Sequence, residues 1–404
     1  MTPTDTLSPA PSARLHAGPP ALLAALRSLA FLDRSRVRAY GLMIALAYLP
    51  MLAKVFLEAT GSVGSDFLAF WGAGKLVVAG TPAKVYDILA EQTVQALSGT
   101  GQLVVFVNPP PYLFVAAPLG LLPYASAWVA WVAAGWSAWF LLCRRLLPDA
   151  PVAVLAFPGA YLAASHAQNG FLTALLLIGG CLALPRRPAL AGVLFGALIV
   201  KPHLALLVPF WLAAGRQWRA FAAAAASAIA LCLASWLVFG TATWLAYPES
   251  FKASATLMAD DTGPFFLRMA TLYAALRYHF DPLTALAGQG LVTLATALVA
   301  CRYWSRAQDT QAAGAMLLAA TALASPYLFS YDLAFLALPL FWLVGAARGE
   351  GWRPWERLAL VALWLAPLAT RAAALPLHLN LMPVASAALV WMIWRRGTAG
   401  AVRA

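Results

Sequence analysis

Charged residues are scarce in this chain. Only 10% of its 404 residues are Asp, Glu, Lys or Arg, whereas 62% are hydrophobic. Soluble domains have about 25% charged and 45–50% apolar residues, so a soluble protein is excluded. The apolar residues form repeated runs separated by short polar breaks, and these runs lack the alternation of barrel strands. We therefore predict an all-α, polytopic membrane protein, because helices satisfy their own backbone hydrogen bonds in lipid.

Cysteine is also rare, and no metal-binding pattern is present. The four cysteines fall singly within or beside apolar runs, with no CxxC pair (Cys143, Cys181, Cys232 and Cys301). They are predicted to be packing residues and carry no information about redox chemistry. The pair Asp260-Asp261 could bind a cation, but acidic loop residues are more often simply solvated. We expect no cofactor and no obligatory metal, and loss of activity on adding EDTA would contradict this.

The net charge of +12 does not indicate nucleic-acid binding, because the basic residues stand at the ends of apolar runs rather than among stacking aromatics. It indicates membrane topology instead. We predict three regions: a disordered or interfacial cytoplasmic N-terminus (1–36), a transmembrane domain of about 10 to 13 helices (37–396) and a cytoplasmic tail (397–404). Several runs are shorter than the roughly 20 residues that cross a bilayer, so some are expected to be half-helices.

The segment from Asn108 to Tyr124, NPPPYLFVAAPLGLLPY, contains five prolines in seventeen residues. Proline removes backbone donors, so this segment is predicted to enter the membrane and return rather than cross it. This topology places the arginines after it, such as Arg144 and Arg186, on the cytoplasmic side, as the positive-inside rule favours. The polar motifs then converge on the opposite, extracytoplasmic face of the inner or plasma membrane. A cysteine-accessibility map that found Arg144 outside would overturn this topology.

Asp66 is a lone carboxylate about eight residues after the first predicted span. It has two interpretations: a structural residue, either solvated in a loop or capping the helix that begins at Phe67, or the working group of a membrane enzyme. Trp71 and Lys75 follow at spacings of five and nine residues, so they need not share its helix face. The local sequence leaves both interpretations open.

Lys201 precedes Pro202 and His203 between two apolar runs. A lysine there costs about 2.5–3.5 kcal/mol at the bilayer centre unless it snorkels to the headgroups or meets an anion. Snorkelling to the headgroups and contact with an anion have nearly equal weight as explanations of Lys201. Together with His203, the Lys201 ammonium would suit a phosphate, for which it acts as a point charge.

Three further polar breaks are candidates for a binding site. Asn108 opens the proline-rich segment, where broken backbone is tolerated if it lines a cavity. In the stretch from His166 to Gly170, an Asn-Gly turn that ends a helix is the favoured interpretation of His166. Tyr331-Asp332 is either the start of a helix, where a negative charge is favourable, or a sugar-binding group.

The order of these motifs resembles glycosyltransferase family 87, over roughly residues 40 to 340. The matching segments are DFLAFWGAGKLVVAGTPAKVYD, NPPPYLFVAAPLGLLP, QNG, KPH before RQWR, and SPYLFSYD. The resemblance implies a GT-C helical bundle with an extracytoplasmic loop after the first helix, and an inverting enzyme that uses a polyprenyl-phosphate sugar. It implies that Asp66 is the catalytic base and, more weakly, that Lys201 and His203 contact the donor phosphate.

We therefore predict a membrane hexosyltransferase that moves a sugar, for which mannose is the family's example, from a polyprenyl phosphate to a lipid, glycan or protein acceptor. Its other partners are membrane lipids, and nucleic acid is not among them. The predicted site has Asp66 as base, no metal, and a set of substrate-binding residues: Lys201, His203, Trp71, Lys75, Gln168, Asn169, Asn108, Tyr331 and Asp332. The main alternative is a transporter or flippase for lipid-linked glycans, in which Lys201 and the broken helices would mark the substrate path. A non-catalytic scaffold is a third possibility.

Overall fold

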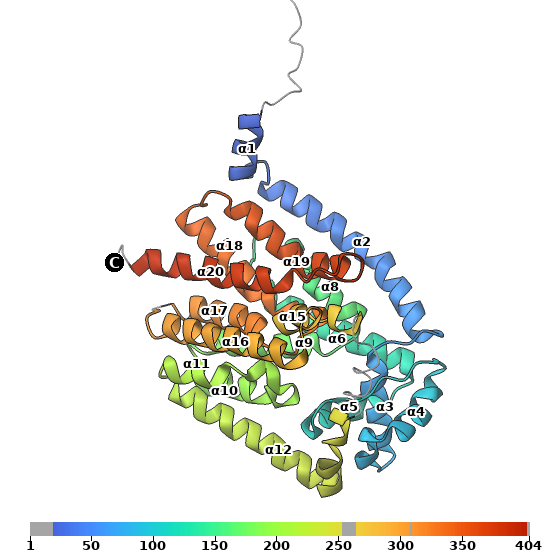
Figure 1. Ribbon diagram of the computed structural model, residues 1–404. Coiled ribbons are helices and arrows are strands. Elements are labelled where there is room, and N and C mark those ends of the chain that lie inside the picture. Colours follow the sequence, from blue (N-terminus) through green and yellow to red (C-terminus); the bar gives the residue numbers. More distant parts are fainter. Residues whose placement is uncertain (1–18, 253–263, 308, 402–404) are drawn as a thin grey trace, which may run out of the picture.

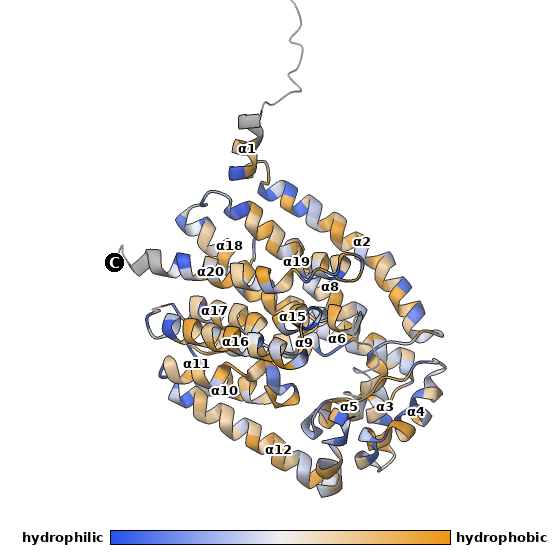
Figure 2. Cartoon of the chain, in the orientation of Figure 1, coloured by the Kyte–Doolittle hydropathy of each residue, from blue (hydrophilic) through white to orange (hydrophobic). Residues whose placement is uncertain are grey.

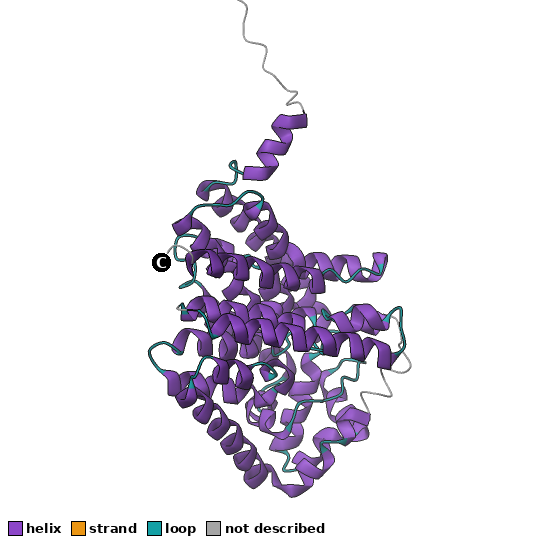
Figure 3. Ribbon diagram, turned by 60° about the vertical axis from the view of Figure 1, so that its left-hand side comes forward, coloured by secondary structure: helices purple, strands orange, loops and turns teal. Residues whose placement is uncertain are grey.

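The computed structural model describes residues 19–252, 264–307 and 309–401. Within these ranges the chain consists of helices and their connections, with one isolated β-bridge between Met269 and Phe329. The helices pack side by side into a single bundle (Figure 1; Figure 3). The predicted all-α architecture is confirmed for the described residues.

Among the described residues, six helices are long and apolar enough to cross a membrane, which makes the chain a multi-pass membrane protein. They are α2 (Arg34–Thr60), α6 (Tyr124–Cys143), α12 (Trp218–Ala246), α16 (Pro282–Trp304), the continuous Ser330–Glu350 formed by η6 (Ser330–Leu336) and α18 (Ala337–Glu350), and α19 (Glu356–Leu377). The predicted total of 10 to 13 spans remains a prediction.

The other apolar runs form shorter helices, because prolines and glycines interrupt them. The apolar residues 152–165 form two helices, with Pro158 at the first position of the second, where its missing N–H costs no hydrogen bond. The remaining elements are α1 (Pro19–Ser28), α3 (Phe67–Val78), η1 (Pro82–Tyr86), α4 (Ile88–Gln95), η2 (Ala96–Ser98), η3 (Pro110–Tyr112), α5 (Leu113–Gly120), α7 (Pro151–Leu155), α8 (Pro158–Ser165), α9 (Gly170–Ala183), α10 (Pro188–Gly196), η4 (Ala197–Val200), η5 (Pro202–Ala205), α11 (Val208–Ala214), α14 (Pro264–Leu267), α15 (Leu272–Arg277), α17 (Thr310–Ala324) and α20 (Met382–Ala401).

Helix α17 lies at the centre of the bundle. Twelve of its residues are buried, and most of them are alanine, leucine or glycine. A helix that is apolar on all sides belongs in the interior of a bundle. Its small side chains let α9, α16, α18 and α20 pack around it.

The proline-rich segment begins and ends at one end of the bundle. The Ser65 hydroxyl, just after α2, lies 3.1 Å from the Tyr124 hydroxyl at the start of α6. At the other end of these two helices, Arg38 donates to the Asp149 carbonyl at 3.2 Å. Helices α2 and α6 are therefore antiparallel neighbours, and the chain between them leaves and returns at the same end of the bundle. Helix α5, with eight residues, rises only about 12 Å, too little to cross a bilayer.

Arginines gather at the opposite end of the bundle, where Figure 2 shows hydrophilic residues at the start of α2 and the end of α18. Asp149 lies 3.8 Å from Arg34 and 3.7 Å from Arg348. On the same side, Arg396 is buried and pairs with Glu350 and Glu356. These contacts join loops that are far apart in sequence. Which side of the membrane this end faces remains a prediction.

Helix α4 presents a buried carboxyl group to α3. Glu91 is only 2% exposed, its Oε2 accepts from Gln95 at 2.6 Å, and its Oε1 has no hydrogen-bond partner among the described residues. Gly72 of α3 faces it so closely that a Cβ there would lie 2.5 Å from Glu91 Oε2. Burial raises the pKa of Glu91 to about 8, although the Gln95 hydrogen bond opposes the shift.

This buried carboxyl predicts that the protein loses stability as the pH rises. Between the ordinary pKa of 4.5 and about 8, folded Glu91 keeps a proton that the unfolded chain releases. The free energy of unfolding should fall through that window by at most about 1.4 kcal/mol per pH unit. Thermal unfolding at pH 5.5 and 8.5 should show this fall in the wild type and a smaller one in Glu91→Gln. Glu58→Gln, a change in a surface pair, serves as the control and should behave as wild type; equal slopes for all three proteins would contradict the prediction.

Candidate functional site

A buried polar centre forms where three distant segments meet. The Lys201 ammonium lies 2.5 Å from Asp332 Oδ1 and donates to Asn169 Oδ1 at 2.9 Å. Lys201 is 7% exposed, Asn169 1% and Asp332 0%. The Lys201 ammonium also lies 5.3 Å from the centre of the Tyr331 ring. The structure therefore brings together four of the residues that the sequence predicted as substrate-binding.

The local sequence explains how each group reaches this centre. Lys201 occupies the break between η4 and η5, which Pro202 enforces because it cannot continue the preceding helix. Asn169 precedes α9, and the next residue, Gly170, packs against η6. A Cβ on Gly170 would lie 2.0 Å from the Tyr331 carbonyl oxygen, so only glycine allows this approach. Asp332 lies in η6, where its Oδ2 also accepts from the Phe329 backbone N–H at 3.2 Å.

Snorkelling, one of the two explanations offered for Lys201, is wrong. The ammonium turns inward to a carboxylate instead of reaching the headgroups. An opposite charge at this distance removes most of the cost of burying a lysine, provided the remaining donors are also paired. The contact of Lys201 with a donor phosphate stays a prediction, and any such phosphate would compete with Asp332.

Asp66 stands directly before α3 but does not cap it. Its backbone is already helical (φ −56°, ψ −19°), and its side chain makes no capping hydrogen bond. An N-cap residue needs an extended backbone so that its side chain can reach back to the helix amides. Asp87 before α4 has that geometry and accepts from two backbone N–H groups. The capping interpretation of Asp66 is therefore wrong, and its half-buried carboxylate is left for another role.

The Asp66 carboxylate lies within electrostatic range of the segment that carries Asp332. Its charge acts on Tyr327 and Tyr331, and together with burial and Asp332 it raises the pKa of Tyr327. The Tyr327 ring stands 5.3 Å from the His203 ring, whose Nε2 is buried without a hydrogen-bond partner among the described residues. A row of aromatic rings, Tyr327, Phe329 and Tyr331, thus connects His203 to Lys201.

Arg371 and Arg268 are site residues that the sequence analysis did not identify. The charge of Asp66 acts on Arg371 from α19, and Arg268 acts on the same guanidinium from the segment after α14. Among the described residues no carboxylate lies within 4 Å of Arg371, because all the salt bridges there join other residues. A sequence signal existed, because Arg371 interrupts the apolar run of α19, and a charge within a span marks a functional site.

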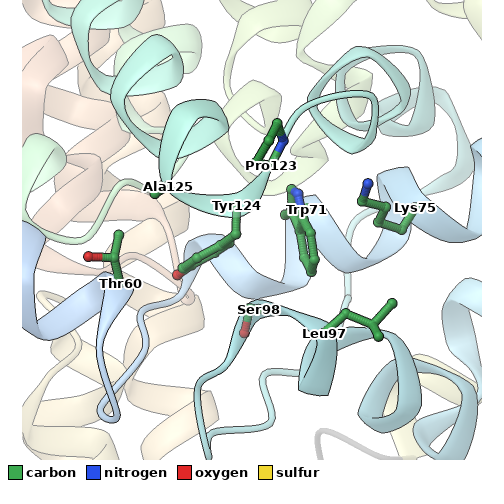
Figure 4. Close-up of a pocket in the computed structure, with 8 residues that line it drawn as sticks. All are labelled: Thr60, Trp71, Lys75, Leu97, Ser98, Pro123, Tyr124 and Ala125. Carbon is green, nitrogen blue, oxygen red and sulfur yellow. The ribbon is translucent and has the colours of Figure 1, made fainter.

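Trp71 and Lys75 line a separate cavity of about 430 Å³, shown in Figure 4. The Lys75 ammonium lies 5.3 Å from the Trp71 ring centre, and Tyr124 faces them from the start of α6. Trp71 Nε1 donates to the Leu122 carbonyl at 2.9 Å. Neither Asp66 nor Lys201 is among the lining residues. The two predicted substrate residues on α3 are thus grouped with each other and not with the Lys201 centre.

The remaining predicted residues have local structural partners. Asn108 donates to the Val200 carbonyl at 3.2 Å, which ties the proline-rich segment to the residue before Lys201. The Gln168 side chain accepts from the Asn169 backbone N–H at 3.3 Å. His166 ends α8 and bonds to the Leu162 carbonyl at 3.0 Å, as the turn interpretation predicted. A substrate contact for Asn108 or Gln168 remains a prediction.

The fold and this site define a class: a polytopic helical membrane protein with a carboxylate and arginines that make no salt bridge within the described part of the chain. A family model described as glycosyltransferase family 87 matches residues 106–326, more than half of the chain. The chain belongs to this family and is a membrane glycosyltransferase. No curated protein and no solved structure matched. Asp66, Asp332 and Arg371 lie outside the matched residues, so their roles depend on the geometry alone.

Proposed function

We propose that this enzyme transfers a sugar, with mannose the first candidate, from a polyprenyl-phosphate donor to a hydroxyl group of a lipid, glycan or protein. We place the reaction at the Asp66 end of the bundle and assign that end to the extracytoplasmic face of the inner or plasma membrane. The opposite end carries the arginine-rich loops, and such loops stay in the cytoplasm. The observation that carries the proposal is a half-buried carboxylate, Asp66, that has no capping role and lies within electrostatic range of Arg371, which in turn interacts with Arg268.

These groups suit the chemistry of an inverting transfer. Asp66 takes the proton of the acceptor hydroxyl, whose oxygen forms a new bond to the anomeric carbon. The bond from that carbon to the phosphate oxygen breaks on the opposite face, and polyprenyl phosphate leaves with the electron pair. The developing charge on the phosphate needs a cation, and a positioned base typically contributes about 10²–10⁴-fold.

Arg371 and Arg268 fit the donor phosphate better than Lys201 does. Arg371 is half-buried and lies within electrostatic range of both Asp66 and Arg268, and Arg268 is exposed. Lys201 already has a carboxylate and an amide as partners. We therefore assign the donor phosphate to Arg371 and Arg268, because a planar guanidinium group can form bidentate hydrogen bonds to phosphate. Lys201 is assigned a positioning role.

The donor class is tested with purified protein in detergent. A radiolabelled polyprenyl-phosphate sugar and the matching nucleotide sugar are supplied in parallel with a membrane-lipid acceptor extract. Labelled product from the lipid-linked donor alone supports the proposal. Product from the nucleotide sugar alone contradicts it.

Arg371→Gln should weaken use of the donor, because it removes a cation beside the leaving phosphate. We expect a loss of about 10-fold or more in kcat/KM for the donor, since hydrogen bonds to charged groups contribute about 1.5–3 kcal/mol. Arg371→Lys keeps the charge and should recover part of the loss. Arg302→Gln, an exposed arginine at the end of α16, is the control. Unchanged donor kinetics in Arg371→Gln would show that another group holds the phosphate.

A further inference from the structure

A large apolar cavity opens at the arginine-rich end of the bundle, far from the proposed reaction. It has a volume of about 810 Å³, within the range of about 300–1,000 Å³ typical of ligand pockets. Helix α2 forms one wall with Val37, Tyr40 and Ile44, and the first turns of α19 form another with Val361 and Trp364. Figure 1 shows α2 along the edge of the bundle, with α18 and α19 beside its first half.

The rim of this cavity carries more positive than negative charge. Arg34, Arg348 and Arg357 all line it. Asp149 is the carboxylate partner of both Arg34, at 3.8 Å, and Arg348, at 3.7 Å. Asp33 also lines the cavity, but it pairs with Arg36 at 3.7 Å. Two carboxylates therefore face four guanidinium groups, which leaves an excess of positive charge at the mouth of an apolar groove.

Arg357 is the residue that indicates an anionic ligand most clearly. Its Nε is buried and has no hydrogen-bond partner among the described residues. Its Nη1 donates only to the Leu29 carbonyl at 3.3 Å, and its guanidinium stacks 4.7 Å from the centre of the Trp352 ring. Within the described part of the chain no carboxylate lies within salt-bridge distance of it. A half-buried guanidinium group with a buried, unpartnered Nε is costly, and an anionic ligand in the cavity would offset that cost.

We propose that this cavity binds an anionic phospholipid of the surrounding leaflet, with one acyl chain between α2 and α19 and the phosphate among Arg34, Arg348 and Arg357. The polyprenyl donor is a poorer occupant, because its phosphate must reach Asp66. Helix α2 has 27 residues and is therefore about 40 Å long, and Arg34 and Asp66 lie at its opposite ends. The lipid would hold α2 against the bundle and is separate from the transfer reaction.

The binding test uses native mass spectrometry of the full-length protein with equal amounts of phosphatidylglycerol and phosphatidylcholine. The wild type should retain phosphatidylglycerol preferentially. Arg34→Gln combined with Arg348→Gln should lower that preference about 10-fold, the order expected when two arginines no longer attract an anionic lipid. Val361→Trp, which fills the groove, should reduce retention of both lipids. The control pair Arg186→Gln with Arg187→Gln removes two exposed arginines of the α9–α10 loop and should leave the preference intact.

A second measurement needs no variant. Phosphatidylglycerol with a photoactivatable acyl chain is cross-linked to wild-type protein, and the labelled peptides are mapped. Labels on residues 34–44 and 357–365 support the site. Equal retention of the two phospholipids, labels only elsewhere, or displacement of the probe by a polyprenyl phosphate but not by phosphatidylglycerol would each overturn the proposal.

Discussion

Replacing Asp66 by Asn should lower sugar transfer by about 10²–10⁴-fold, the range that a positioned general base contributes. The amide has nearly the same shape as the carboxylate but cannot accept the proton of the acceptor hydroxyl. The loss should appear in kcat more than in the KM for the donor, because Asp66 acts on the acceptor. Initial rates with a labelled polyprenyl-phosphate sugar measure it.

The fold should survive this substitution, since the Asp66 side chain makes no capping hydrogen bond. Asp87→Asn is a matched control in the same region. Asp87 caps α4 through its Oδ1, which accepts from Leu89 N–H at 2.9 Å, and asparagine caps helices about as well. We expect Asp87→Asn to keep wild-type activity and both variants to unfold near the wild-type temperature. Near-wild-type turnover in Asp66→Asn would remove Asp66 from the mechanism.

The sequence predicted the helical membrane architecture because the residues that indicate it are spread over the whole chain. Composition and long apolar runs need no knowledge of contacts. Helix count is harder, because prolines such as Pro158 and Pro202 cut apolar runs into pieces shorter than a bilayer. The number of spans depends on how those pieces stack, and one apolar run does not contain that information.

The sequence identified several residues of the candidate site, but it did not show which of them contact one another. Lys201 and Asp332 are 131 residues apart in sequence, so their contact depends on the packing of both η6 and η4 against α9 and not on local pattern. For Asp66, the capping interpretation depended on one pair of backbone angles, which residue identity does not fix. Arg371 was not predicted, because most arginines of this chain stand at the ends of apolar runs, whereas Arg371 lies inside the apolar helix α19.

Breaking the Lys201–Asp332 pair from one side should destabilise the protein strongly. Lys201→Met leaves the Asp332 carboxylate buried without its cation, and Asp332→Asn leaves the ammonium without its anion. Each single substitution should cost about 3–5 kcal/mol, whereas the double substitution should recover a large part of that loss because no uncompensated charge remains. The asparagine can still accept from the Phe329 N–H, which keeps the η6 turn closed.

Denaturant unfolding of the detergent-solubilised wild type, the two single variants and the double variant measures the coupling between Lys201 and Asp332. Lys54→Met, which breaks the exposed pair with Glu58, is the control and should change stability by about 1 kcal/mol or less. If the two single effects simply add in the double variant, the pair is not a coupled unit. If Lys201→Met remains stable but loses donor binding, Lys201 serves the phosphate directly, and the positioning role proposed for it fails. The four proteins therefore separate a lysine that builds the site from one that binds the substrate.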